Sequence, residues 1–125
     1  MPASAPRHRL FSYAGCSTCR KALAWLAGQG LQSGRDLDVV DITIAPPSPA
    51  ELRQALVQLG RSRLFNTSGK SYRTLGAAHL KAMSDDQAID ALAADGRLIK
   101  RPFLISADGG MATGFKPEEW QALLG

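Results

Sequence analysis

The features that this sequence lacks limit what kind of protein it encodes. No apolar run approaches the roughly 20 residues that a membrane-spanning helix needs, and residues 1–9 form a short polar lead rather than a secretory signal. The chain holds only two cysteines, and at 125 residues it is long enough to build one core without covalent staples. We therefore expect a single cytoplasmic domain over residues 1–125, with no membrane partner.

The chain also has few histidines and only a small net charge. The two histidines, His8 and His79, have no ligand-like spacing, so a zinc site that they complete with the cysteines is a minor alternative. We expect no metal and no bound cofactor. The net charge of +4 favours anionic partners only mildly and gives no nucleic-acid signature, so we expect no direct contact with nucleic acid.

Both cysteines lie in one motif, Cys16-Ser17-Thr18-Cys19, where a predicted strand turns into a predicted helix. Unpaired amides and the positive end of the helix dipole stabilise a thiolate at a helix N-terminus, so the first cysteine should be nucleophilic near neutral pH. The second lies one turn further on, where it can resolve a mixed disulfide formed at the first. The pattern predicts a redox site. Inert buried thiols remain the alternative.

Strand and helix patterns alternate along the chain without repeats. Two capping boxes, at residues 48–51 and 84–87, predict the starts of two helices. The predicted strands span residues 9–13, 37–42, 102–106 and 111–113, and the predicted helices span 17–28, 49–59, 85–96 and 117–124. Residues 61–76 are interpreted as irregular and basic, with a turn at 66–69 and a short helical piece near 72–75.

This order of elements predicts an α/β fold with a central mixed sheet flanked by helices. Ligands of such sheets gather at strand ends and helix N-termini, which is where Cys16 is expected. Trp25 and Trp120 stand at helical spacing and are expected in the core. The basic cluster of Arg61, Arg63, Lys70 and Arg73 is interpreted as a solvated face or as a surface for glutathione carboxylates or acidic patches of a partner.

Four blocks of the sequence resemble the arsenate reductase (ArsC) and Spx/MgsR family. They are residues 13–22 (YAGCSTCRKA), 64–73 (LFNTSGKSYR), 98–102 (LIKRP) and 114–116 (GFK), and the resemblance covers residues 10–124. It implies a thioredoxin-like (glutaredoxin-like) fold with a helical insertion at about residues 45–97, between the βαβ and ββα halves. It also implies a cis peptide bond before Pro102, beside the active cysteine.

The resemblance assigns roles to single residues. In arsenate reductases that use glutathione and glutaredoxin, one cysteine attacks arsenate and three arginines hold the oxyanion. Cys16 matches that nucleophile and Arg101 matches one arginine, whereas Asn66 and Lys116 occupy the regions of the other two. Cys19 stands where those enzymes usually carry serine.

The resemblance leaves three functions open. The first is a thiol-disulfide oxidoreductase with Cys16 as nucleophile, Cys19 as resolving thiol and Arg101 stabilising the thiolate, with glutathione as co-substrate or a glutaredoxin- or thioredoxin-type reductant. Ser17, Thr18, Pro102, Asn66 and Lys116 are its expected substrate-binding residues. The second is an Spx/MgsR-type redox switch that binds the RNA polymerase α subunit. The third, weaker alternative is arsenate reduction itself.

Overall fold

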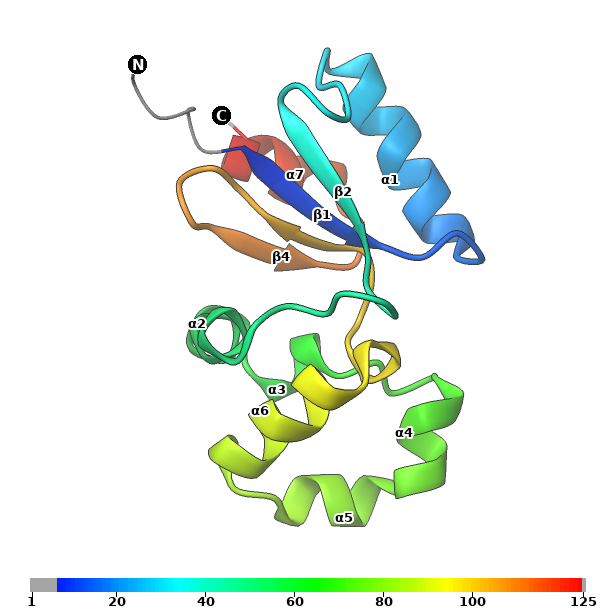
Figure 1. Cartoon of the computed structure of the whole chain (residues 1–125), viewed down its shortest axis with the longest axis vertical. Helices are drawn as coiled ribbons and strands as arrows, with labels where there is room; N and C mark the ends of the chain where they lie inside the picture. Colours follow the sequence, from blue (N-terminus) through cyan, green and yellow to red (C-terminus); the bar gives the residue numbers. More distant parts are fainter. Residues whose placement is uncertain (1–6, 125) are drawn as a thin grey trace.

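The protein, described here from a computed structural model over residues 7–124, is built on a four-stranded mixed sheet of order β2-β1-β3-β4. Strands β1 (His8–Ser12) and β2 (Leu37–Asp41) are parallel, and β3 (Phe103–Ile105) lies antiparallel to β1 and to β4 (Met111–Thr113). The sheet occupies the upper half of Figure 1, with a cluster of helices beneath it. This is the expected thioredoxin-like arrangement.

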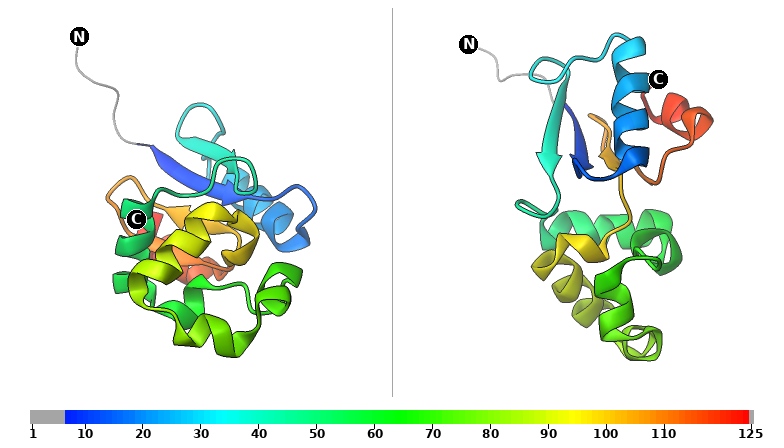
Figure 2. Two further views of the ribbon diagram at one scale, coloured as in Figure 1. Left: turned by 60° about the horizontal axis from the view of Figure 1, so that its bottom comes forward. Right: turned by 90° about the vertical axis from the view of Figure 1, so that its right-hand side faces the viewer.

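Two helices cover one face of the sheet. Helix α1 (Ser17–Gly28) follows β1, and α7 (Pro117–Leu124) follows β4. The right-hand view of Figure 2 shows both helices on the same side of the strands. Because side chains alternate along a strand, Leu10, Leu104 and Ala112 all point into this layer, where they pack with the fully buried Trp120. Trp120 is core, as predicted.

The opposite face packs against the helices between β2 and β3. Phe11 and Phe103 have ring centroids 5.7 Å apart and join a core that continues into Leu52 and Ile89. The helices of this segment are α2 (Pro49–Leu59), α3 (Arg61–Leu64), α4 (Lys70–Leu75), α5 (Ala77–Ala82) and α6 (Asp85–Ala94), followed by the 3₁₀ helix η1 (Gly96–Leu98). The helical part therefore shares a core with the sheet.

Both predicted capping boxes form. The side chain of Ser48 accepts a hydrogen bond from the amide of Glu51, whose carboxylate accepts in return from the Ser48 amide. Ser84 and Gln87 make the same reciprocal pair at the start of α6. Such boxes satisfy two otherwise unpaired amides, which explains why these helix starts could be located from sequence.

The interpretation of residues 61–76 is correct in part. The turn at 66–69 is present, with Gly69 donating to the Asn66 carbonyl at 3.2 Å, and the short helical piece expected near 72–75 is part of α4, but the rest of the segment is not irregular. The chain forms α3 and α4 there, and the unpredicted α5 follows. These helices are 4 to 6 residues long and have no side-chain caps. Tertiary contacts hold them instead: the Arg61 guanidinium donates to the Met83 carbonyl at 2.8 Å and pairs with Asp85.

Two further expectations concern the backbone. The peptide bond between Arg101 and Pro102 is cis, as the family resemblance implied. Within residues 7–124, no helix combines the length and the apolar character required to cross a lipid bilayer.

Candidate active site

Cys16 is the N-cap of α1, in the short loop that leaves β1. Its amide donates to the Tyr13 carbonyl at 3.0 Å, which closes a tight turn. Its sulfur accepts a hydrogen bond from the Cys19 amide at 3.3 Å, in the position where a helix usually places a serine or aspartate oxygen. Both cysteines are free thiols; Cys16 is half-buried and Cys19 is completely buried under the helix.

The two thiols differ in acidity because their surroundings differ. Burial opposes ionisation of Cys16, but hydrogen bonds from the thiol and amide of Cys19, the positive charge of Arg101 and the Thr18 amide outweigh it, so the pKa of Cys16 lies below the ordinary thiol value. Burial, and then the hydrogen bond to Cys16, raise the pKa of Cys19. Cys16 is therefore the more acidic thiol of the pair and Cys19 the less acidic one.

Arg101 reaches the site from the segment before β3. Its guanidinium lies 4.8 Å from the centre of the Tyr13 ring, a cation–π contact that fixes its position beside the Cys16 turn. Pro102, which follows it, is buried, and its carbonyl accepts from the Gly114 amide at 3.0 Å. The positive charge that acts on Cys16 comes from Arg101, whereas Arg20, in the first turn of α1, donates to the Ala14 carbonyl.

A polar cavity of about 430 Å³ opens beside Arg101 and Tyr13. We call it the site cavity; it is lined by Tyr13, Thr43, Asn66, Gly69, Lys70, Ser71, Arg97 and Arg101. Within residues 7–124, no carboxylate forms an ion pair with Lys70, Arg97 or Arg101. The cavity is therefore cationic and uncompensated, which suits an anionic group of a ligand.

The structure separates the predicted substrate-binding residues into those at this cavity and those elsewhere. Asn66 lines the cavity, and its side-chain amide donates a hydrogen bond to the Arg97 carbonyl at 3.4 Å. Ser17 and Thr18 are exposed in the first turn of α1, and Thr18 acts on Cys16 through its backbone amide. Lys116 is exposed just before α7 and does not line the cavity.

Sequence reasoning missed Lys70, Arg97 and Thr43 as site residues. Lys70 was one of four basic residues interpreted together, and the structure divides that cluster. Arg61 and Arg63 make contacts within the protein. Arg61 pairs with Asp85, and Arg63 pairs with Glu119 and also donates to the Thr113 carbonyl. A sequence signal for Arg97 existed only in its closeness to the 98–102 block.

The zinc alternative finds no support in the geometry. His8 lies at the start of β1, where its Nδ1 accepts from the Ala107 amide at 2.8 Å, and His79 is exposed on α5. Among the described residues, no group of three or more potential ligands comes together.

A four-stranded mixed sheet, a first helix that begins at a cysteine pair, and a cis-proline before β3 together define a thioredoxin-like protein. Comparison with known sequences identifies the family within the thioredoxin-like proteins. The chain belongs to the ArsC family, which matches residues 11–123.

Three relatives illustrate the range of this family. The uncharacterized protein YusI of Bacillus subtilis is 39% identical over 113 residues, which cover 87% of this chain and 91% of that protein. A Streptococcus mutans structure named as a possible arsenate reductase is 36% identical, covers 93% of this chain and 98% of its own, and superposes with a TM-score of 0.81. The global transcriptional regulator Spx of Streptococcus pyogenes serotype M3 is 29% identical over 117 residues, 92% of this chain and 83% of the regulator.

Proposed function

We propose that this ArsC-family protein is a thiol-disulfide oxidoreductase in which Cys16 attacks and Cys19 resolves. The observation that carries the proposal is that the two thiols differ in exposure and in pKa. Cys16 is half-buried, has a lowered pKa and accepts a hydrogen bond from the backbone amide of Cys19, which is buried and has a raised pKa. An acidic, accessible thiol followed one turn later by a protected one is the arrangement that disulfide exchange requires.

The proposed reaction conserves atoms and electrons. The Cys16 thiolate attacks one sulfur of a substrate disulfide, forms a mixed disulfide and releases the other sulfur as a thiolate. Cys19 then loses its proton and attacks the Cys16 sulfur, which forms the Cys16–Cys19 disulfide and releases the second substrate thiolate. The substrate gains two electrons. Two equivalents of a monothiol such as glutathione, or a glutaredoxin- or thioredoxin-type dithiol, return the pair to its reduced form.

Arg101 serves the first step in two ways. Its charge favours the Cys16 thiolate, and its place in the wall of the site cavity lets it hold an anionic group of the substrate. No metal or bound cofactor takes part in this scheme. A cytoplasmic location, where such a pair is kept available for catalysis, stays a prediction.

Two single substitutions test this function. Cys16→Ser is expected to abolish reduction of a small disulfide such as hydroxyethyl disulfide in the presence of glutathione and glutathione reductase. Cys19→Ser is expected to retain activity, because a second glutathione can resolve the mixed disulfide. Equal loss in both variants contradicts the glutathione branch, in which a second glutathione resolves the mixed disulfide, and makes Cys19 essential for that step. Full activity of Cys16→Ser contradicts the proposal itself.

The likeness to Spx favours a second candidate, a redox-gated regulatory partner without turnover. Here the Cys16–Cys19 disulfide changes the surface at the start of α1, and the partner is the RNA polymerase α subunit. Pull-down of that subunit with reduced and oxidised protein separates the two functions. Redox-dependent capture combined with no disulfide reduction supports the regulator.

The Streptococcus mutans structure keeps arsenate reduction as the weaker third candidate. At the positions that the family pattern gives to two arginines, this chain has the uncharged Asn66 and Lys116, which does not line the site cavity, and neither offers the planar fork that holds an oxyanion in two bonds. Arsenate-dependent oxidation of glutathione in the presence of glutaredoxin measures this activity directly, and we expect little.

A further inference from the structure

A second hollow continues from the site cavity into the helical part of the molecule. It has a volume of about 550 Å³, and Figure 1 shows the helices that bound it, α4 and α6, beneath the sheet. We call it the α4–α6 groove. Its apolar lining comes from Leu75, Met83, Ala91, Ala94 and Leu98.

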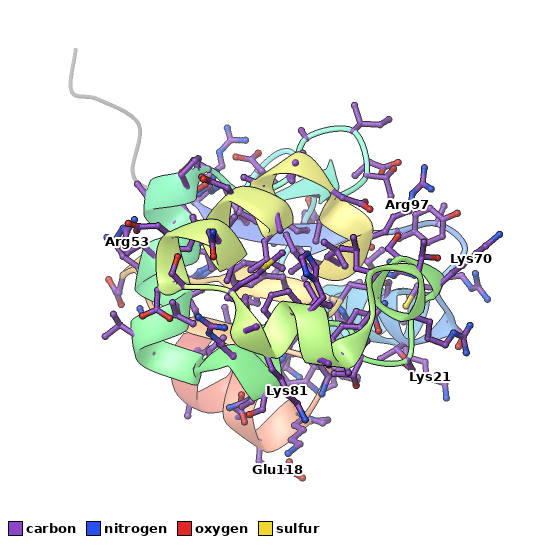
Figure 3. The ribbon with its side chains drawn as sticks, turned by 90° about the horizontal axis from the view of Figure 1, so that it is seen from below. Lys21, Arg53, Lys70, Lys81, Arg97 and Glu118 are labelled. Atoms are coloured by element: carbon purple, nitrogen blue, oxygen red, sulfur yellow. The ribbon has the colours of Figure 1, made fainter. Side chains whose placement is uncertain are left out.

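The cavity and the groove share Lys70, Ser71 and Arg97 in their walls. The two hollows are therefore neighbours, with Lys70 and Arg97 between the side of Arg101 and the apolar side chains of the groove. The acidic residue of the groove, Asp95, already accepts a hydrogen bond from the Arg97 amide at 3.0 Å. Figure 3 shows the labelled Lys70 and Arg97 on the same side of the molecule.

Exposed apolar side chains border the same surface. Leu75 is 41% exposed in the groove, Tyr13 is 38% exposed in the cavity wall, and Ile44, which follows the cavity residue Thr43, is 80% exposed. Apolar side chains grouped around a polar hollow are typical of a surface that another protein covers. A small thiol bound in the cavity would leave the whole groove in contact with water.

We propose that the cavity and the α4–α6 groove together bind an extended segment of a protein substrate, with acidic residues beside its reactive cysteine and apolar residues further along. The inference rests on the proposed function, because it names the substrate class of the same dithiol site. The acidic side chains lie against Lys70, Arg97 and Arg101, and the apolar ones against Leu75 and Met83. The disulfide of that segment takes the two electrons that Cys16 and Cys19 give up.

Binding can be measured without any redox chemistry. The probe is a fluorescein-labelled peptide with serine at the position of the reactive cysteine, followed by two glutamates and two leucines, titrated with the full chain and followed by anisotropy. A charge-reversed peptide carries lysines in place of the glutamates, and a polar peptide carries serines in place of the leucines. We expect the acidic-apolar peptide to bind at least about tenfold more tightly than the charge-reversed one.

Substitutions locate the binding surface. Lys70→Ala and Arg97→Ala should each weaken binding of the acidic-apolar peptide about two- to fivefold, the size of one exposed ion pair, without weakening the charge-reversed peptide. Leu75→Ser should weaken the acidic-apolar peptide and leave the polar one unchanged. Lys81→Ala is the matched control, an exposed lysine on the neighbouring α5 that Figure 3 shows away from Lys70 and Arg97. Equal affinity for the three peptides, or equal loss in Lys81→Ala and Lys70→Ala, overturns the proposal.

A kinetic measurement decides between a protein segment and a small thiol. The same peptides, with the cysteine restored as a mixed disulfide of 5-thio-2-nitrobenzoate, are compared with the corresponding glutathione derivative by release of the coloured thiolate. A higher kcat/KM for the acidic-apolar peptide supports the proposal, and a higher value for glutathione overturns it in favour of a small anionic thiol. Failure to reduce any probe contradicts the oxidoreductase function, while the binding assay still decides whether the segment docks.

Discussion

Gly96 lies at the seam between the helical part and the sheet, and replacing it tests how rigidly the two are joined. A methyl group at this position would lie 2.7 Å from the carbonyl carbon of Ile42 and closer still to its oxygen. Ile42 cannot easily withdraw, because its own amide donates to the Ser12 carbonyl at 2.9 Å. Overpacking costs about 1–3 kcal/mol, and an obstacle made of backbone places Gly96→Ala at the upper end, about 3 kcal/mol.

The assay is thermal unfolding followed by circular dichroism. For a chain of this size, 1 kcal/mol corresponds to about 4 °C in Tm, so Gly96→Ala should melt about 12 °C below the wild type. Gly28→Ala is the matched control, because no atom lies within 4 Å of the added methyl and alanine favours the helix, which keeps its stability within about 1 kcal/mol of the wild type. A Gly96→Ala variant that melts within about 2 °C of the wild type refutes the reasoning.

Three further changes have expected outcomes. Arg101→Met should shift the midpoint of Cys16 alkylation by iodoacetamide to higher pH, because removing a positive charge disfavours the thiolate, and Arg101→Lys should largely prevent the shift. Ser84→Ala removes the oxygen that caps α6 and should cost about 1 kcal/mol in urea unfolding, with no change in the alkylation profile. Leu104→Ala empties a fully buried position of β3 and should cost about 2–5 kcal/mol in the same assay.

The elements that could be predicted from sequence are those whose signals are local. The capping boxes at Ser48 and Ser84 need only four consecutive residues, and the CxxC motif needs the same number. The helical piece expected near residues 72–75 lies within α4. Helices α3 and α5 carry no such local signal, since they are held by contacts between distant segments such as that of Arg61 with Met83. An isolated helix of so few residues is unstable in water, so a local pattern does not predict it.

The residues of the candidate site also differ in whether a local sequence signal identifies them. Cys16 and Arg101 belong to short motifs and could be named before the fold was known. Lys70 lies in the 64–73 block but was interpreted only as part of the basic cluster, and Arg97 lies in no motif. Both residues reach the cavity because α4 and η1 pack near each other. Lys116 is exposed and, like Cys16, does not line this cavity, so its role in substrate binding stays a prediction.

Arg97 adds a positive charge to the site cavity of this ArsC-family protein that the family pattern does not predict. Counted along the family pattern, the chain keeps one of three arginines. Counted in the site cavity, it has the guanidinium groups of Arg97 and Arg101 together with the ammonium of Lys70. Of these three charges only that of Arg101 lowers the pKa of Cys16, so in the proposed reaction Lys70 and Arg97 contact a part of the ligand away from the reacting sulfur. An oxyanion that Cys16 attacks needs cationic side chains around the Cys16 sulfur. A peptide whose disulfide Cys16 attacks, and which carries carboxylates on neighbouring residues, needs cationic side chains at a greater distance from that sulfur. This distribution of charge suits the disulfide exchange that we propose better than it suits arsenate reduction.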